Sequence, residues 1–247
     1  AVVIIQQGLF AAAWGVVWAL RMAPRAAPAF AASTAALALA LALVALRPTV
    51  PDWVGWGVAN MASIISMVAF RRGVQSFAAQ PTSVRDDLAL IALSSLLQFW
   101  ALTFDGMLPR MGVPHLVAAP VMLHAAWIVM RHLREEFGVK LARWCAVPLG
   151  VLGTLHVARM VGLLVWPTHV AAPLNQANDA GAAFILIVMA VALVTNLSLF
   201  SLIVVRVVRR LENMTRQDAM TGLTNRRAIE DALEAETNRA RRRRGSF

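Results

Sequence analysis

Cys145 is the only cysteine in this 247-residue sequence. A single cysteine excludes an internal disulfide framework and any metal cluster built from several thiols, so we interpret it as a small apolar residue of a helix. Charged residues are also scarce, at 15% of the sequence, whereas hydrophobic residues make up 59% and the mean hydropathy is +0.65. Soluble domains carry about 25% charged residues. The composition therefore indicates that most of the chain lies in a lipid bilayer.

Neither a cleaved targeting signal nor a membrane β-barrel is expected from this sequence. No basic segment with a cleavage site precedes the first apolar run, so we expect no cleaved signal peptide. The apolar runs are continuous and show no alternation with a period of two, which excludes a barrel. Because lipid cannot satisfy open backbone polar groups, these runs are expected to be helices. The predicted fold class is an all-α polytopic membrane helix bundle.

Seven apolar segments are long enough to cross a hydrocarbon core about 30 Å thick. Residues 1–205 are therefore predicted to form one domain of seven transmembrane helices. The expected spans are Val2 to Leu20, Ala29 to Leu46, Trp53 to Phe70, Leu88 to Phe104, Pro114 to Met130, Trp144 to Trp166 and Gly181 to Val205.

Positive charge is distributed unevenly among the connecting segments. Every second connection is rich in Lys and Arg, whereas the others hold only Arg47 and Arg110. Lys and Arg accumulate on the cytoplasmic side of membrane proteins, so the amino terminus is predicted outside and the carboxy terminus inside. Topology then explains the formal net charge of +10, and no nucleic acid is expected as a partner. The cytoplasmic set is Arg21, Arg25, Arg71, Arg72, Arg85, Arg131, Arg134, Lys140, Arg143, Arg206, Arg209 and Arg210.

Small residues recur at every fourth position of the sixth segment. Such a stripe lets helix backbones approach closely, so it predicts a helix-packing face, with a dimer interface or a moving contact as the alternative. Pro148 is expected to weaken or kink the same helix. The stripe consists of Ala146, Gly150, Thr154, Ala158 and Gly162.

Ionisable side chains inside the apolar segments form the candidate sensing site. His156 and Arg159 lie three positions apart, on neighbouring parts of one helical face. Such residues are costly in a membrane and usually face a partner or a watery cavity. Their candidate companions are His124, Asp105 and Asp179. The alternative is that Arg159 snorkels to the outer headgroups. A pair of histidines on two helices could bind a metal or haem, but no H-x-x-x-H or comparable pattern occurs, so no metal is assigned.

The seventh segment continues beyond its apolar part without proline or glycine, so a single helix is expected to leave the membrane. Residues 206–217 are predicted to be a juxtamembrane signalling helix. Apolar positions with spacings of four and three resemble a short heptad seam that would pair two helices. The alternative is a simple juxtamembrane helix whose arginines touch anionic lipid. The seam consists of Val204, Val208 and Leu211, continued by Thr215 and Asp218.

Residues 218–227 read DAMTGLTNRR and resemble the opening of a GGDEF (diguanylate cyclase) domain. In that family a D-x-[LM]-T-G-L-x-N-R-R run lies where a helix from a sensor enters the catalytic domain. The resemblance implies that Asp218 pairs with Arg226 or Arg227 and so ties the incoming helix to the domain. The residues that match this domain-coupling motif are Asp218, Met220, Thr221, Gly222, Leu223, Asn225, Arg226 and Arg227.

The resemblance covers residues 218–247 only, which are expected to be the truncated start of an α/β GGDEF domain. No Gly-Gly pair occurs, so the loop that names the family is absent, and we expect no catalytic residue and no cofactor in this chain. For the intact parent, the resemblance implies a bacterial inner-membrane enzyme that condenses two GTP, with Mg²⁺, to cyclic di-GMP. It also implies a homodimer paired through the signalling helix. The alternative is a non-catalytic seven-helix receptor, scaffold or transporter with a remnant of the motif.

Overall fold

A computed structural model describes residues 2–166 and 179–215, together with the single residues Ile229, Leu233, Glu236, Thr237 and Arg239. The described residues form helices and no strands, so the predicted all-helical class is confirmed for them. The chain divides into two compact units, Ala1–Leu199 and Phe200–Phe247.

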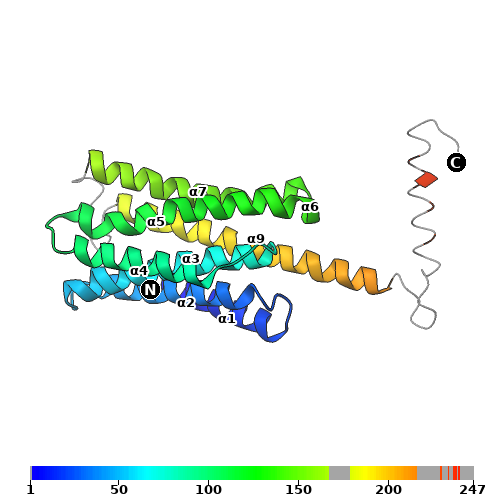
Figure 1. Cartoon of the computed structure of the whole chain (residues 1–247), viewed down its shortest axis with the longest axis horizontal. Coiled ribbons are helices and arrows are strands. Elements are labelled where there is room, and N and C mark those ends of the chain that lie inside the picture. Colours follow the sequence, from blue (N-terminus) through cyan, green and yellow to red (C-terminus); the bar gives the residue numbers. More distant parts are fainter. Residues whose placement is uncertain are drawn as a thin grey trace. The chain divides into compact units, whose positions relative to one another are not determined.

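The first unit is a bundle of helices that lie side by side (Figure 1). Helix α1 packs against α2, α2 against α3, α3 against α5, and α5 against α7, while α4 packs against α3 and α5. Two π-helical segments, η1 and η2, directly precede α3 and α6. The elements are α1 (Val2–Ala19), α2 (Ala27–Ala45), η1 (Trp53–Val58), α3 (Ala59–Phe77), α4 (Val84–Ala101), α5 (Met107–Ile128), η2 (Val129–Leu133), α6 (Arg134–Phe137), α7 (Val139–Val165) and α9 (Asp179–Thr215).

Hydrogen bonds attach the first part of α9 to two other helices of the bundle. The indole Nε1 of Trp14 on α1 donates to Asn196 Oδ1 at 2.9 Å, and Trp14 is completely buried. The thiol of Cys145 on α7 donates to the backbone oxygen of Ser198 at 3.6 Å. Cys145 is thus a buried helix residue, as its apolar neighbours in the sequence indicate. In the part of α9 that belongs to the first unit, the helix therefore contacts both α1 and α7.

Within the described parts of the chain, six helical segments are long and apolar enough to cross a membrane. They correspond to six of the seven expected spans, so a multi-pass membrane protein is the architecture that the described helices fit. The exception is the fourth. Helix α4 begins at Val84 rather than Leu88, and Arg85, Asp86 and Asp87 therefore lie within its first turns. The Ser83 hydroxyl caps the helix by accepting from the Asp86 N–H at 3.2 Å, which explains why it starts before its apolar part.

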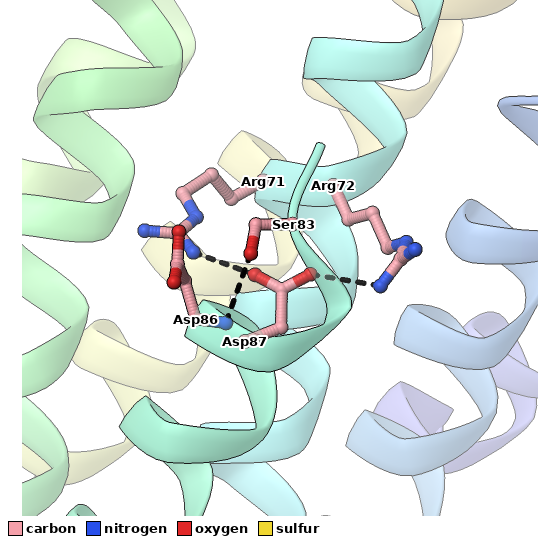
Figure 2. A network of polar contacts seen from close by, with 5 residues as sticks. All are labelled: Arg71, Arg72, Ser83, Asp86 and Asp87. Carbon is pink, nitrogen blue, oxygen red and sulfur yellow. Dashed lines mark hydrogen bonds and ion pairs between the residues drawn. The ribbon is translucent and has the colours of Figure 1, made fainter. Parts of the chain in front are cut away.

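An ion-pair cluster anchors the start of α4 to α3. Asp87 is buried, and its carboxylate accepts from Arg71 Nη2 at 2.6 Å and from Arg72 Nη1 at 3.0 Å. Figure 2 shows both guanidinium groups reaching this one carboxylate, with the Ser83 cap beside it. The two arginines were predicted only as markers of topology. They also neutralise a buried charge and hold two helices together.

Aromatic rings pack tightly where α1, α2 and α3 meet. The Phe30 ring lies between Trp14 and Phe70, with centroid distances of 4.5 Å and 5.5 Å. A Cβ at Gly73 would lie 2.6 Å from Phe30 Cε1, closer than any real contact. Only glycine at this position lets α3 approach the Phe30 ring.

The substitution Gly73→Ala is expected to destabilise the bundle by about 1–3 kcal/mol, because the added methyl group overpacks a core in which Phe30 is held on both sides. The free energy of unfolding in detergent measures this effect. Gly15→Ala is the matched control, because a Cβ at Gly15 would meet no atom within 4 Å. If both substitutions lower stability equally, the close contact at Gly73 has no energetic weight.

Candidate functional site

A cavity of about 250 Å³ lies among α1, α2, α3, α5, α7 and α9. An engineered cavity of about 150 Å³ holds benzene, so this one has room for a small ligand or several waters. Its surface is mostly apolar, with a few polar side chains, which is the usual character of a ligand site. Its polar side chains include Gln7, Ser33, Ser66, His115, His156, Thr195 and Asn196.

Two histidines meet in the wall of this cavity. His115 on α5 and His156 on α7 lie with their Nδ1 atoms 2.8 Å apart and their ring centroids 5.1 Å apart. A hydrogen bond between two imidazoles needs one donor and one acceptor, so at least one ring must be neutral. The contact crosses a helix–helix interface and brings together two titratable groups from distant parts of the sequence.

The chain connection explains why these two residues meet. Helices α5 and α7 are packed side by side and are joined by η2 and α6, so they form a helical hairpin. The number of residues from His115 to Glu135 equals the number of residues from Glu136 to His156. In an antiparallel hairpin, residues equally far from the turn come to the same level. This symmetry is a signal that the sequence contains, although His115 was not among the predicted site residues.

The other members of the predicted sensing site lie elsewhere. His124 is on the exposed side of α5, where its ring stacks on Trp127 with a centroid distance of 5.7 Å. Arg159 is on α7, three residues after His156, and is partly buried. Asp105 is exposed in the connection between α4 and α5, and the side chain of Asp179 is outside the described residues. The structure therefore joins His156 to His115 and not to His124.

Most polar side chains of the cavity wall are satisfied by the protein. Asn196 accepts from Trp14 and donates to the backbone oxygen of Ala192 at 2.9 Å, and the Ser33 and Ser66 hydroxyls lie 3.3 Å apart. Gln7 differs: it is buried, and its Nε2 has no hydrogen-bond partner among the described residues. A buried amide donor that faces a cavity without a partner favours an occupant with an acceptor group.

A cluster of cations and Trp56 lies at the end of α2 and the start of η1. Arg47 also lines the cavity, and its Nε donates to the backbone oxygen of Gly55 at 2.9 Å. Its guanidinium carbon Cζ lies 3.5 Å from the centroid of the Trp56 ring. Burial lowers the pKa of Arg47 to about 10, so it stays charged at neutral pH. Arg110 pairs with Asp52 at 3.0 Å. The two cations of the charge-poor loops thus converge at one end of the bundle.

The small-residue stripe of α7 is buried only at its ends. Ala146 and Gly162 are buried, whereas Thr154 and Ala158 are exposed, and a Cβ at Gly150 would meet no atom within 4 Å. The tight contact of this helix is made instead by Gly153, where a Cβ would lie 2.7 Å from Leu123 Cγ. The middle of the stripe is exposed. Its alternative role, as an interface between two copies of the chain, stays a prediction.

The predicted seam of the signalling helix lies on α9. Val204, Val208 and Leu211 are all exposed, with exposed fractions of 55%, 45% and 57%. Thr215 is the last residue of α9, and the motif residues 218–227 lie outside the described residues. The apolar side chains of the seam are thus available on the surface of this helix.

Comparison with known proteins gives no match: no family model fits the chain, no curated protein is significantly similar in sequence, and no solved structure is significantly similar in fold. Among the described residues there is also no cluster of three or more His, Cys, Asp and Glu side chains placed to bind a metal ion. The function must therefore be argued from the cavity, the histidine pair and the sequence motif.

Proposed function

We propose that this chain is the membrane-embedded sensory module of a diguanylate cyclase. The observation that carries the proposal is the DAMTGLTNRR run of residues 218–227, which begins three residues after the last residue of α9. Helix α9 extends from an apolar, membrane-capable segment into a polar one without a break. This is the arrangement in which a membrane sensor is joined to a GGDEF domain in the family that the run resembles.

The proposed topology has seven spans, with the amino terminus outside and the carboxy terminus in the cytoplasm of a bacterial cell. Six spans are supported by length and composition. We add α4 because it packs against α3 and α5, and because its one buried acidic side chain, Asp87, is neutralised by Arg71 and Arg72. The orientation rests on the uneven distribution of Lys and Arg among the loops. In this proposed orientation, residues 218–247 would lie on the side where GTP is found.

The proposed mechanism begins at the cavity. Ala192, Thr195 and Asn196 of α9 form part of its wall, together with the His115–His156 pair. A ligand that binds more tightly when α9 is in one of two arrangements shifts the population toward that arrangement. Because α9 is one continuous helix to Thr215, a rotation or shift of its first part moves the exposed seam as well. Pairing of two such seams would set how two GGDEF domains face each other.

In the whole protein, each of the two domains would hold one GTP with Mg²⁺, and the product would be cyclic di-GMP. The metal supplies activation of the attacking group and stabilisation of phosphate charge. The described residues contribute none of this chemistry. Their proposed role is to sense and to transmit.

The reading frame of the gene beyond the codon for Phe247 tests this proposal at once. A frame that continues into strand aspartates and a Gly-Gly-[Asp/Glu]-Glu-Phe loop supports a catalytic cyclase. A continuing frame with a degenerate loop would favour a nucleotide- or protein-binding scaffold. A stop codon directly after Phe247 would contradict the proposal and favour a receptor or transporter, for which flux of a substrate through the cavity would be measured.

A further inference from the structure

The histidine pair in the cavity wall is accompanied by two methionines with matching spacing. Met111 precedes His115 by four residues on α5, and Met160 follows His156 by four residues on α7. Residues four apart share one face of a helix. Because α5 and α7 form a hairpin, Met111 and Met160 are also equally far from its turn. The hairpin thus places both methionines one helical turn from the histidines and toward the same end.

Two observations place the methionines near the cavity and the α5–α7 interface. Met111 lines the cavity together with His115 and His156. Met160 reaches across to α5, where its Sδ lies 3.8 Å from the position that a Cβ at Gly112 would occupy. Gly112 is buried and directly follows Met111. Met111 therefore shares the cavity wall with the two imidazoles, and Met160 reaches across the α5–α7 interface one helical turn from His156.

We propose that His115, His156, Met111 and Met160 form a binding site for one Cu(I) ion. Thioether ligands select Cu(I) over harder ions, and imidazole is a common ligand of copper. A tetrahedral ion with bonds of about 2.0–2.1 Å separates two nitrogens by about 3.3 Å, so the imidazoles need to open by about 0.5 Å from their contact of 2.8 Å. This adjustment is within the reach of two side-chain rotations.

The charge of the site also favours a monovalent ion. All four ligands are neutral, and the described residues provide no cluster of carboxylates or thiolates that would balance a divalent ion. The cost of burying an ion in a medium of low dielectric constant grows with the square of its charge. Arg159, three residues after His156 on the same helix, adds a further positive charge near the site, which opposes a divalent ion more than a monovalent one. Zn²⁺ is therefore the disfavoured occupant.

If the chain is a sensory module, as proposed above, Cu(I) is its stimulus. The ion would clamp α5 to α7 in the wall that also contains Ala192, Thr195 and Asn196 of α9. This second statement rests on the proposed function, whereas the binding of the ion does not. The binding of the ion is therefore tested by itself, in the absence of nucleotide.

Binding is tested by titrating the purified full chain, in detergent and without oxygen, with Cu(I) held by the chromogenic chelator bicinchoninate. The chain is expected to withdraw one Cu(I) per molecule from the chelator. In His115→Ala and His156→Ala the affinity for Cu(I) is expected to fall by at least about 100-fold. Even the loss of a residue that only hydrogen-bonds to a metal ligand lowers metal affinity by about 10–100-fold. In Met111→Leu and Met160→Leu, which keep the side-chain volume, we expect a loss of about 10-fold or more.

Matched controls come from the same helical hairpin. His124→Ala removes an exposed histidine of α5, and Met130→Leu removes a methionine of η2, so both variants are expected to bind Cu(I) as the unmodified chain does. Absence of uptake, or uptake that survives loss of both His115 and His156, would overturn the site. Leucine variants that bind Cu(I) normally, or Zn²⁺ bound as tightly as Cu(I), would overturn the role of the thioethers. The titration requires no nucleotide, so its outcome is independent of whether the parent makes cyclic di-GMP.

Discussion

Replacing Asp87 by alanine is expected to destabilise the first unit by about 3–5 kcal/mol, which is the usual cost of removing one partner from a buried ion pair. The carboxylate is the shared partner of Arg71 and Arg72 and is only 8% exposed, so its loss leaves two guanidinium groups facing each other. The same change separates the start of α4 from α3. The measurement is the free energy of unfolding of the chain in detergent micelles.

Asp86→Ala is the control for this prediction. Asp86 is the exposed neighbour of Asp87, and the Ser83 cap accepts from its backbone N–H, which alanine retains. A surface substitution of this kind is expected to change stability by less than about 0.5 kcal/mol. Equal stabilities of the two variants would show that the cluster in Figure 2 does not anchor α4.

Insertion of a single alanine between Arg206 and Val207 is expected to change the cyclic di-GMP output of the whole protein by about 5- to 150-fold, the usual range of coupling between two sites. One residue turns an α-helix by about 100°. Every residue after the insertion is rotated by that angle relative to the bundle, and the seam is split: Val204 no longer faces the same way as Val208 and Leu211. Output is measured in a bacterial host without other diguanylate cyclases.

A seven-residue insertion separates helix rotation from helix length. Duplication of residues 204–210 adds one heptad, which restores the seam to within about 20°. This longer insertion is expected to return the output to the level of the unmodified protein, although it moves the coupling motif farther along the axis. If the single alanine and the full heptad gave the same output, the seam would have no part in signalling.

Composition and apolar runs predict the helices of this fold well, because the length of a hydrophobic segment is a local property of the chain. They are less informative about α4. There the polar cap at Ser83 and the ion pairs of Asp87 extend the helix beyond its apolar part. The need for a partner of Asp87 is not visible from composition, because Arg71 and Arg72 belong to the preceding helix.

The candidate site shows the same limit. His156 was predicted from its place inside an apolar segment, which is also a local property. Its partner depends on which helices pack and at what level, so the sequence analysis named His124, whereas the α5–α7 hairpin brings His115 to His156. The equal sequence distances of His115 and His156 from Glu135 and Glu136 carry this information once the hairpin is known. The Met111–Met160 pair follows from the same symmetry.

The most direct test of the central claim is the enzymatic product of the protein encoded by the whole gene. The protein is purified, reconstituted into lipid nanodiscs and incubated with GTP and Mg²⁺, and cyclic di-GMP is measured by mass spectrometry. Our account predicts that cyclic di-GMP is formed and that its rate of formation changes when the α9 seam is rotated by one inserted residue. A protein that forms no cyclic di-GMP, or forms it at a rate indifferent to α9, would contradict the assignment of this chain as a cyclase sensor.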